Sequence, residues 1–351
     1  MKIVTVVGAR PQFVKAAPMS RALRPRHHEI LVHTGQHYDD NMSASFFRDL
    51  DIPEPDIDLG AGSGSHAEQT ARMLTGIEQI LLSEKPDWLL VYGDTNSTVA
   101  GALAAAKVHV PVAHVEAGLR SFNRRMPEEI NRVVTDHLSA LLLCPSEVAA
   151  RNLAAEGITS GVEIVGDIMA DTLLGAAARA DQSEILARHG LEPRAYYLAT
   201  VHRPENTDAP VRLAAIMSAF ADLGRPILFP THPRTQKALA AQGIEVPGNV
   251  RVCDPLGYLD MVRAMRDAAA ILTDSGGMQK EAYWLSVPCV TLRDETEWVE
   301  TIETGWNVLV GADSRRIAEA AAEPPRPAAR PTLYAGDGRA ASRIAAALEA
   351  A

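Results

Sequence analysis

Two short apolar runs in the first half of the chain each end in a carboxylate. Residues 88–92 and 110–115 are rich in Val and Leu and are bounded by turn residues, a pattern that predicts buried parallel strands. Asp94 follows the first run, Glu116 closes the second, and Glu128 opens a predicted helix soon afterwards. Because parallel strands end at one edge of a sheet, where α/β folds bind ligands, we expect the three acids to meet in one cleft.

Each acid also has a simpler interpretation. Asp94 is in a position to cap the next helix, and Glu128 would favour a helix N-terminus through the helix dipole. A capping role suits Glu116 less well, because Ala117 and Gly118 do not open a helix. Three acids placed in this way favour a site. The basic residues expected beside them are Arg120, Arg124 and Arg125.

The N-terminal segment predicts a place for phosphate. A strand over residues 3–7 leads through a turn at Gly8 into a helix that begins near Pro11. Arg10 lies in the turn and Lys15 one helical turn later, so two cations flank a helix N-terminus, which favours anions. The segment matches neither the dinucleotide fingerprint nor the P-loop. Two solvated basic residues are the alternative.

The second half of the chain repeats the strand-to-helix pattern with histidine and arginine at strand ends. A strand beginning at Tyr196 delivers His202 and Arg203 to its carboxyl edge, and the next delivers His232 and Arg234. Two such pairs at equivalent positions indicate a polar site. For either histidine alone, a structural role is an equally good explanation.

A glycine turn in the sequence DSGG predicts an anion site. The backbone N–H groups of Ser275, Gly276 and Gly277 come between a short strand and a helix, an arrangement that forms an anion-binding nest. Glu281 lies one turn into that helix and is placed to accept hydrogen bonds from ribose hydroxyls. Arg293 follows a further strand at the same edge. A simple tight turn is the alternative for the glycines.

Length and composition limit the class of protein. A chain of 351 residues suggests two domains, and a net charge of −10 argues against a nucleic-acid or membrane surface. Three widely separated cysteines in or beside apolar runs fit reduced thiols, and no metal-ligand spacing is present. The chain starts directly with a predicted strand and has no apolar run of membrane-spanning length. We therefore expect a cytoplasmic protein.

The order of predicted elements indicates an α/β fold with doubly wound parallel sheets. The first βα series ends near residue 168, and residues 168–180 are predicted to be a connection. An amphipathic helix is expected over residues 66–84, with Ala71, Leu74 and Ile77 among its apolar face.

Six motifs in this chain resemble those of one family. They are GARPQFVK, GDTNST, HVEAGLRS with MPEEINR, VHRPEN, PTHPRT and LTDSGGMQKEA. In this order, over residues 2 to about 349, they resemble the non-hydrolysing UDP-N-acetylglucosamine 2-epimerases. The resemblance implies two Rossmann-like domains in a GT-B arrangement, a UDP-sugar in the interdomain cleft, no metal or other cofactor, and a homodimer. The implied division is 1–168, 169–335 and a helix over 336–351 that returns to the first domain.

The resemblance also implies roles for individual residues. Catalytic roles fall on Asp94, Glu116, Glu128 and His202. Substrate contacts are expected from Arg10, Lys15, Arg203, Ser275, Gly276, Gly277, Glu281 and Arg293. Positions at which bacterial members bind a second, regulatory UDP-GlcNAc are matched by Gln36, His37, Arg72 and His232.

Several segments depart from the common family pattern. Gln12 stands where many members have Glu, Leu256 and Met261 stand near the expected uracil position, and Trp298 changes a TERPE-like segment. The forms TGQHYDDNMS and TEWVE are closer to the branch that includes UDP-2,3-diacetamido-glucuronic acid 2-epimerases. That substrate, a hydrolysing epimerase, a GT-B glycosyltransferase and a UDP-sugar sensor are the alternatives to a UDP-GlcNAc 2-epimerase.

Overall fold

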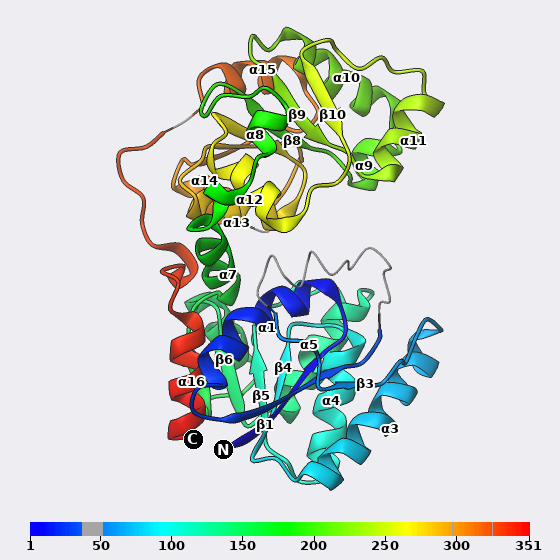
Figure 1. The fold of residues 1–351 in the computed structure, drawn as a ribbon, viewed down its shortest axis with the longest axis vertical. Coiled ribbons are helices and arrows are strands. Elements are labelled where there is room, and N and C mark those ends of the chain that lie inside the picture. Colours follow the sequence, from blue (N-terminus) through cyan, green and yellow to red (C-terminus); the bar gives the residue numbers. More distant parts are fainter. Residues whose placement is uncertain (37–51, 297, 325) are drawn as a thin grey trace. The chain divides into compact units, whose positions relative to one another are not determined.

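The computed structural model describes residues 1–36, 52–296, 298–324 and 326–351, with the side chains of Arg10 and Ala335 excepted. The chain divides into two compact units, residues 1–172 with 334–351 and residues 173–333 (Figure 1). Each unit contains one parallel sheet.

The first unit is built on a seven-stranded sheet with the order β3-β2-β1-β4-β5-β6-β7. Its strands are β1 (Lys2–Val7), β2 (His28–His33), β3 (Ile57–Asp58), β4 (Trp88–Tyr92), β5 (Val112–Val115), β6 (Leu141–Cys144) and β7 (Val162–Ile164). The central strands are buried along their whole length, as expected of apolar runs covered on both faces. Every neighbouring pair is parallel, so the strands present their carboxyl ends at one edge.

The helices of the first unit begin at residues that the sequence marks. They are α1 (Arg10–Leu23), α3 (His66–Glu84), α4 (Asn96–Lys107), α5 (Pro127–Leu138), α6 (Glu147–Ala155) and α16 (Ala340–Ala350). Ser65, Thr95 and Ser146 each cap a helix by accepting from a backbone N–H of its first turn. Gly8 must be glycine, because a Cβ there would lie 2.0 Å from Ser97 Oγ.

Two predictions about helices were wrong. Residues 168–180 were expected to be a connection, but α7 (Ile168–Ala177) is a helix that runs across the boundary between the two units. Most of the apolar residues of α7 are buried. The sequence of α7 therefore lacks the alternation of apolar and polar faces by which we recognised the other helices. On α3, Ala71 is exposed, and Met73 and Gln69 are buried instead.

The second unit is built on a six-stranded parallel sheet with the order β10-β9-β8-β11-β12-β13. Its strands are β8 (Tyr197–Thr200), β9 (Ile227–Pro230), β10 (Val250–Cys253), β11 (Ala270–Thr273), β12 (Cys289–Thr291) and β13 (Asn307–Leu309). Its helices are α8 (Ile185–Arg188), α9 (Pro204–Thr207), α10 (Pro210–Asp222), α11 (Pro233–Ala241), α12 (Tyr258–Arg266), α13 (Gly276–Trp284), α14 (Val299–Glu303) and α15 (Ser314–Ala322).

The C-terminal helix α16 belongs to the first unit, where it packs against α1. The Asp171 carboxylate accepts from the backbone N–H groups of Ala340 and Ala341 at its start. Near its end, the Glu349 carboxylate lies 2.9 Å from both Arg26 Nη1 and His27 Nε2. Among the helices of the described residues, none is long and apolar enough to cross a membrane.

The burial of the three cysteines predicts low thiol reactivity in the folded protein. Burial raises the pKa of Cys144 and Cys289 to about 12 and that of Cys253 to about 11. The reactive thiolate is therefore scarce at pH 8. We expect little reaction with a disulfide reagent at pH 8 in buffer, and three reacting thiols per chain in denaturant. Rapid labelling of all three in the folded protein would contradict the packing described here.

Candidate active site

Lys15 lies among the carboxylates at the edge of the first sheet. Its Nζ contacts Glu116 Oε2, and the two side chains are 12% and 11% exposed. Burial acts to lower the pKa of Lys15, but Glu116, Asp94 and Asp167 outweigh it and raise this pKa above its ordinary value. Lys15 therefore pairs with Glu116, and the negative charge of Asp94 also favours its ammonium form.

Glu116 occupies a turn whose backbone is in the left-handed region, with φ of 69°. This conformation costs a non-glycine residue about 1–2 kcal/mol, so neighbouring contacts must maintain it. The N–H groups of Glu116 and Ala117 both donate to the Leu143 carbonyl, at 3.1 and 3.3 Å. Beside them Gly93 has φ of 61°, and a Cβ there would lie 3.3 Å from both Glu116 Oε2 and Lys15 Nζ.

Asp94 is held by an arginine of α5. Arg132 donates to Asp94 Oδ2 from Nε at 2.9 Å and from Nη2 at 2.5 Å. Asp94 does not cap the following helix, because Thr95 does so. Arg132 was not among the predicted site residues, although its position four residues after Glu128 places both on one helix face.

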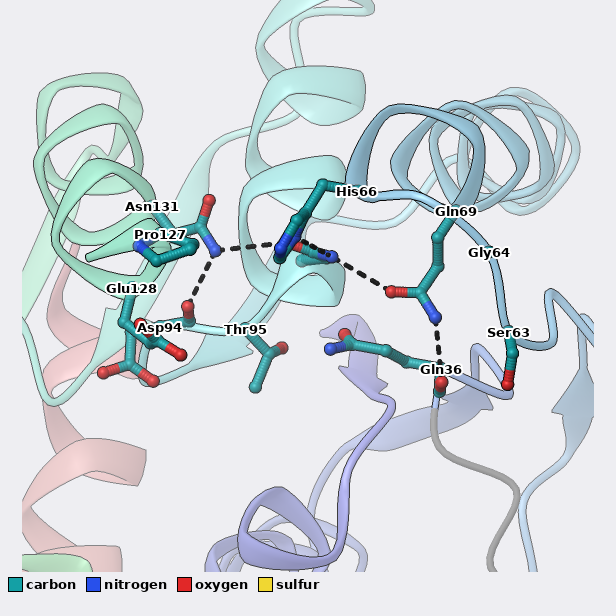
Figure 2. Close-up of a pocket in the computed structure, with 11 residues that line it drawn as sticks. Gln36, Ser63, Gly64, His66, Gln69, Asp94, Thr95, Pro127, Glu128 and Asn131 are labelled. Atoms are coloured by element: carbon teal, nitrogen blue, oxygen red, sulfur yellow. Dashed lines mark hydrogen bonds between the residues drawn. The ribbon is translucent and has the colours of Figure 1, made fainter. Parts of the chain in front are cut away.

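Asp94 and Glu128 line the same polar cavity of about 400 Å³ (Figure 2). Its other lining residues include the amide side chains of Gln69, Asn96 and Asn131, none of which we predicted. These amides form a chain, because Asn131 Nδ2 donates to Asn96 Oδ1 at 3.4 Å and Asn96 Nδ2 donates to Gln69 Oε1 at 3.0 Å. Asn131 Nδ2 also donates to the Asp94 carbonyl at 2.9 Å. Among the described lining residues there are two carboxylates and neither a lysine nor an arginine, so this part of the cavity favours neutral polar groups over anions.

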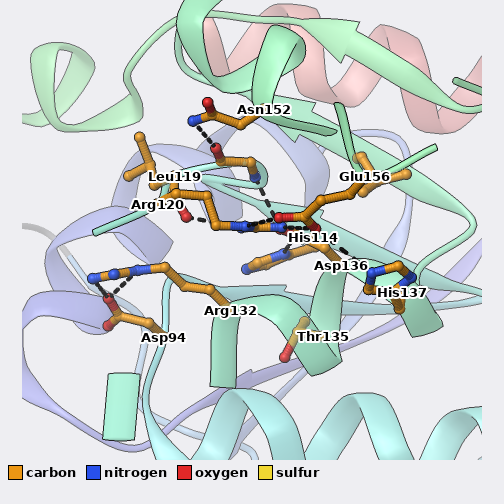
Figure 3. Close-up of polar contacts among 12 residues, drawn as sticks. Asp94, His114, Leu119, Arg120, Arg132, Thr135, Asp136, His137, Asn152 and Glu156 are labelled. Atoms are coloured by element: carbon orange, nitrogen blue, oxygen red, sulfur yellow. Dashed lines mark hydrogen bonds and ion pairs between the residues drawn. The ribbon is translucent and has the colours of Figure 1, made fainter. Parts of the chain in front are cut away.

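The three arginines expected beside the acids lie in different surroundings. Arg120 was predicted to face them, but its side chain is 1% exposed and binds Asp136 and Glu156 instead (Figure 3). Arg124 and Arg125 are exposed. Glu129 accepts from the N–H groups of Ser121 and Phe122 and so holds the loop before α5.

The positions matched to a regulatory ligand are spread over both units. Gln36 lines the cavity, and its Oε1 accepts from the N–H and hydroxyl of Ser97 at 2.9 and 2.7 Å. Arg72 is exposed and donates to the Ser63 carbonyl. His232, in the second unit, caps α11 by accepting from the Arg234 N–H. All of His37 and the side chain of Arg10 lie outside the described residues.

In the second unit, the buried carboxylate of Asp274 connects two predicted segments. It accepts from the N–H groups of His202 and Arg203 at 3.1 and 3.0 Å and from Asn206 Nδ2 at 3.0 Å. Asp274 directly precedes Ser275, so the histidine segment and the glycine turn are held together. The His202 side chain is 47% exposed.

The glycine turn opens α13, which begins at Gly276. The Ser275 N–H donates to Thr273 Oγ1 at 2.9 Å, so it is already engaged, whereas N–H groups in the first turn of a helix have no intrahelical acceptor. A Cβ at Gly277 would meet no described atom within 4 Å, which leaves this helix N-terminus open. Glu281 is half-buried one turn later. Arg203 and Arg293 line a separate cavity of about 250 Å³.

Comparison with known proteins gives a consistent result. A family model described as UDP-N-acetylglucosamine 2-epimerase matches residues 21–349. The chain is 54% identical to a UDP-N-acetylglucosamine 2-epimerase homolog of Methanococcus maripaludis, over 91% of each chain. It is 50% identical to the UDP-2,3-diacetamido-2,3-dideoxy-D-glucuronate 2-epimerase of Pseudomonas aeruginosa, over 98% of each.

Similarity to a solved structure indicates the same family as the two sequence relatives. The Methanocaldococcus jannaschii UDP-GlcNAc 2-epimerase in complex with UDP-GlcNAc and UDP is 42% identical and superposes with a TM-score of 0.84 over 100% of both chains. The predicted fold class, an α/β protein with two parallel sheets, is confirmed by this similarity and by the topology. The chain therefore belongs to the UDP-N-acetylglucosamine 2-epimerase family.

Proposed function

We propose that this protein interconverts UDP-GlcNAc and UDP-ManNAc by inverting the configuration at C2. The observation that carries the proposal is that Asp94, Glu116 and Glu128 lie in one unit. Asp94 and Glu128 line a shared cavity, and Glu116 pairs with Lys15, whose pKa the charge of Asp94 also raises. The names and bound ligands of the relatives support a nucleotide sugar as the substrate.

The reaction explains why several carboxylates are needed. No carbonyl acidifies the C2 hydrogen of a 2-acetamido sugar, so direct removal at neutral pH is slow. Departure of UDP gives C1 positive character and acidifies that hydrogen, and a carboxylate then completes anti-elimination to a 2-acetamidoglucal. Protonation of C2 from the other face and return of UDP to C1 give the epimer. The two faces require more than one proton-handling group.

In this proposal both units contribute residues to the reaction. The three acids of the first unit handle the protons. Arg10, Lys15, His202 and Arg203 bind and stabilise the departing diphosphate, and so does the turn Ser275–Gly277. Glu281 binds the ribose, and Arg293 provides a further polar contact.

A second substrate is favoured by one specific observation. The relative that is 50% identical over 98% of the chain acts on a UDP-2,3-diacetamido-glucuronate. The same elimination applies to that sugar, because its C2 also carries an acetamido group.

The first experiment follows C2 by NMR in D₂O with each of the two UDP-sugars. We expect epimerisation of one or both, with solvent deuterium at C2 of the product. Epimerisation without deuterium would exclude proton exchange at C2. Free N-acetylmannosamine would indicate a hydrolysing epimerase, a need for an acceptor would indicate a glycosyltransferase, and binding without turnover would indicate a sensor.

The second experiment replaces the acids by their amides. Glu116→Gln and Glu128→Gln should each lower kcat by about 10² to 10⁴, the usual value of general acid–base catalysis, and leave UDP affinity within about twofold. Glu147→Gln, at an exposed position at the start of α6, is the control and should match wild type. Turnover near wild type in both acid variants would remove them from the mechanism.

We further propose a cytoplasmic homodimer, with a UDP-sugar as its small-molecule partner and neither nucleic acid nor membrane among its partners. The three free thiols fit a reducing compartment. Light scattering after size exclusion should give twice the 37.7 kDa of one chain. A mass of one chain across micromolar concentrations would contradict the dimer.

A further inference from the structure

One side of α5 carries the first predicted acid, contacts the second, and contacts the turn that holds the third. Glu128, Arg132 and Asp136 are four residues apart, so they lie along the same side of the helix. Glu128 is itself one acid, and Arg132 binds the second, Asp94. Asp136 contacts the turn that carries the third, Glu116.

Asp136 holds that turn from both sides (Figure 3). Its carboxylate is fully buried, with Oδ1 2.7 Å from His114 Nδ1 and Oδ2 accepting from the Gly118 N–H at 3.1 Å. His114 and Gly118 lie two residues before and two residues after Glu116. Arg120 Nη1 also donates to Oδ2, at 2.7 Å. The carboxylate thus fixes the chain on each side of a residue whose backbone is strained.

His114, which Asp136 contacts, also contacts the residue before Asp94. His114 is 0% exposed, and its Nε2 lies 2.7 Å from the Gly93 carbonyl. Its Nδ1 faces Asp136, so the ring bridges the Asp136 carboxylate and the Gly93 carbonyl. A movement of His114 would therefore affect the backbone next to both Asp94 and Glu116.

We propose that Asp136 is a positioning residue, which keeps Glu116 and, through His114, the Asp94 segment in the geometry that proton transfer requires. The inference rests on the proposed function, because it concerns the acids of that reaction. Asp136 touches no substrate in this account. A buried ion pair that only stabilised the fold would change stability, not the rate of the folded enzyme.

The chain offers a matched control. Arg120 binds two carboxylates, Asp136 on one side and Glu156 on the other, the latter with contacts of 2.7 and 2.8 Å. Glu156 contacts neither His114 nor Gly118 among the described hydrogen bonds and ion pairs. Asp136→Ala and Glu156→Ala each remove one carboxylate from the same arginine, but only the first releases the Glu116 turn.

The first test compares the kinetics of these variants after their folding has been checked by circular dichroism and thermal unfolding. Asp136→Ala should lower kcat by about 100-fold, the loss that follows a displacement on the order of 1 Å, with KM within about twofold. Glu156→Ala should keep kcat within about twofold. Asp136→Asn should recover most of the loss, because its side chain has the same shape and can still contact His114 Nδ1 while its oxygen accepts from the Gly118 N–H.

The second test asks whether Asp136 acts through Glu116. In a Glu116→Gln background, Asp136→Ala should lower the residual C2 deuterium exchange by less than about threefold, because residues that act as a unit are not additive. If Asp136→Ala does not fold, His114→Gln replaces it in both tests. Its amide still reaches the Gly93 carbonyl but loses Asp136, so we expect a loss in the same direction.

Three results would overturn the inference while wild type turns over. The first is a folded Asp136→Ala variant, or its His114→Gln substitute, with wild-type kcat. The second is a loss of kcat in Glu156→Ala as large as that in Asp136→Ala. The third is full additivity of Asp136→Ala and Glu116→Gln in C2 deuterium exchange. A wild type that exchanges no C2 deuterium with either UDP-sugar would instead count against the proposed function.

Discussion

Carboxylates brought close together repel one another, and the first unit depends on cations that offset this repulsion. Lys15 of α1 contacts Glu116, and Arg132 of α5 binds Asp94 with two hydrogen bonds. Both cations are mostly buried, so their charges are weakly screened by water. The helices α1 and α5 are therefore part of the site, because each positions a cation that offsets the negative charge of the carboxylates at the edge of the sheet.

In the proposed function the second unit instead binds an anion, the diphosphate. Two groups that are open for such a contact are the His202 side chain and the N-terminus of α13 at Gly277. Asp274 is negative but fully buried, and the N–H groups of His202 and Arg203 surround it. Its charge is thus used to hold two segments together.

Much of this arrangement was predictable, because it follows from local patterns. The bounds of α3 and β4 match the prediction, since local apolar patterns and the residues that flank them define these elements. Asp136 and its contact with His114 were missed because the pairing joins a strand and a helix that only tertiary packing brings together. The prediction for Arg120 was wrong for the same reason: its partners, Asp136 on α5 and Glu156 just after α6, are brought to it by tertiary packing.

The central claim is that the gathered acids act on a C2 hydrogen that only the departure of UDP makes acidic. Positional isotope exchange tests it most directly. With ¹⁸O in the bridge between C1 and the β-phosphate, cleavage and return of UDP should move the label into non-bridging positions of that phosphate during epimerisation. Complete epimerisation with all label still in the bridge would contradict the account.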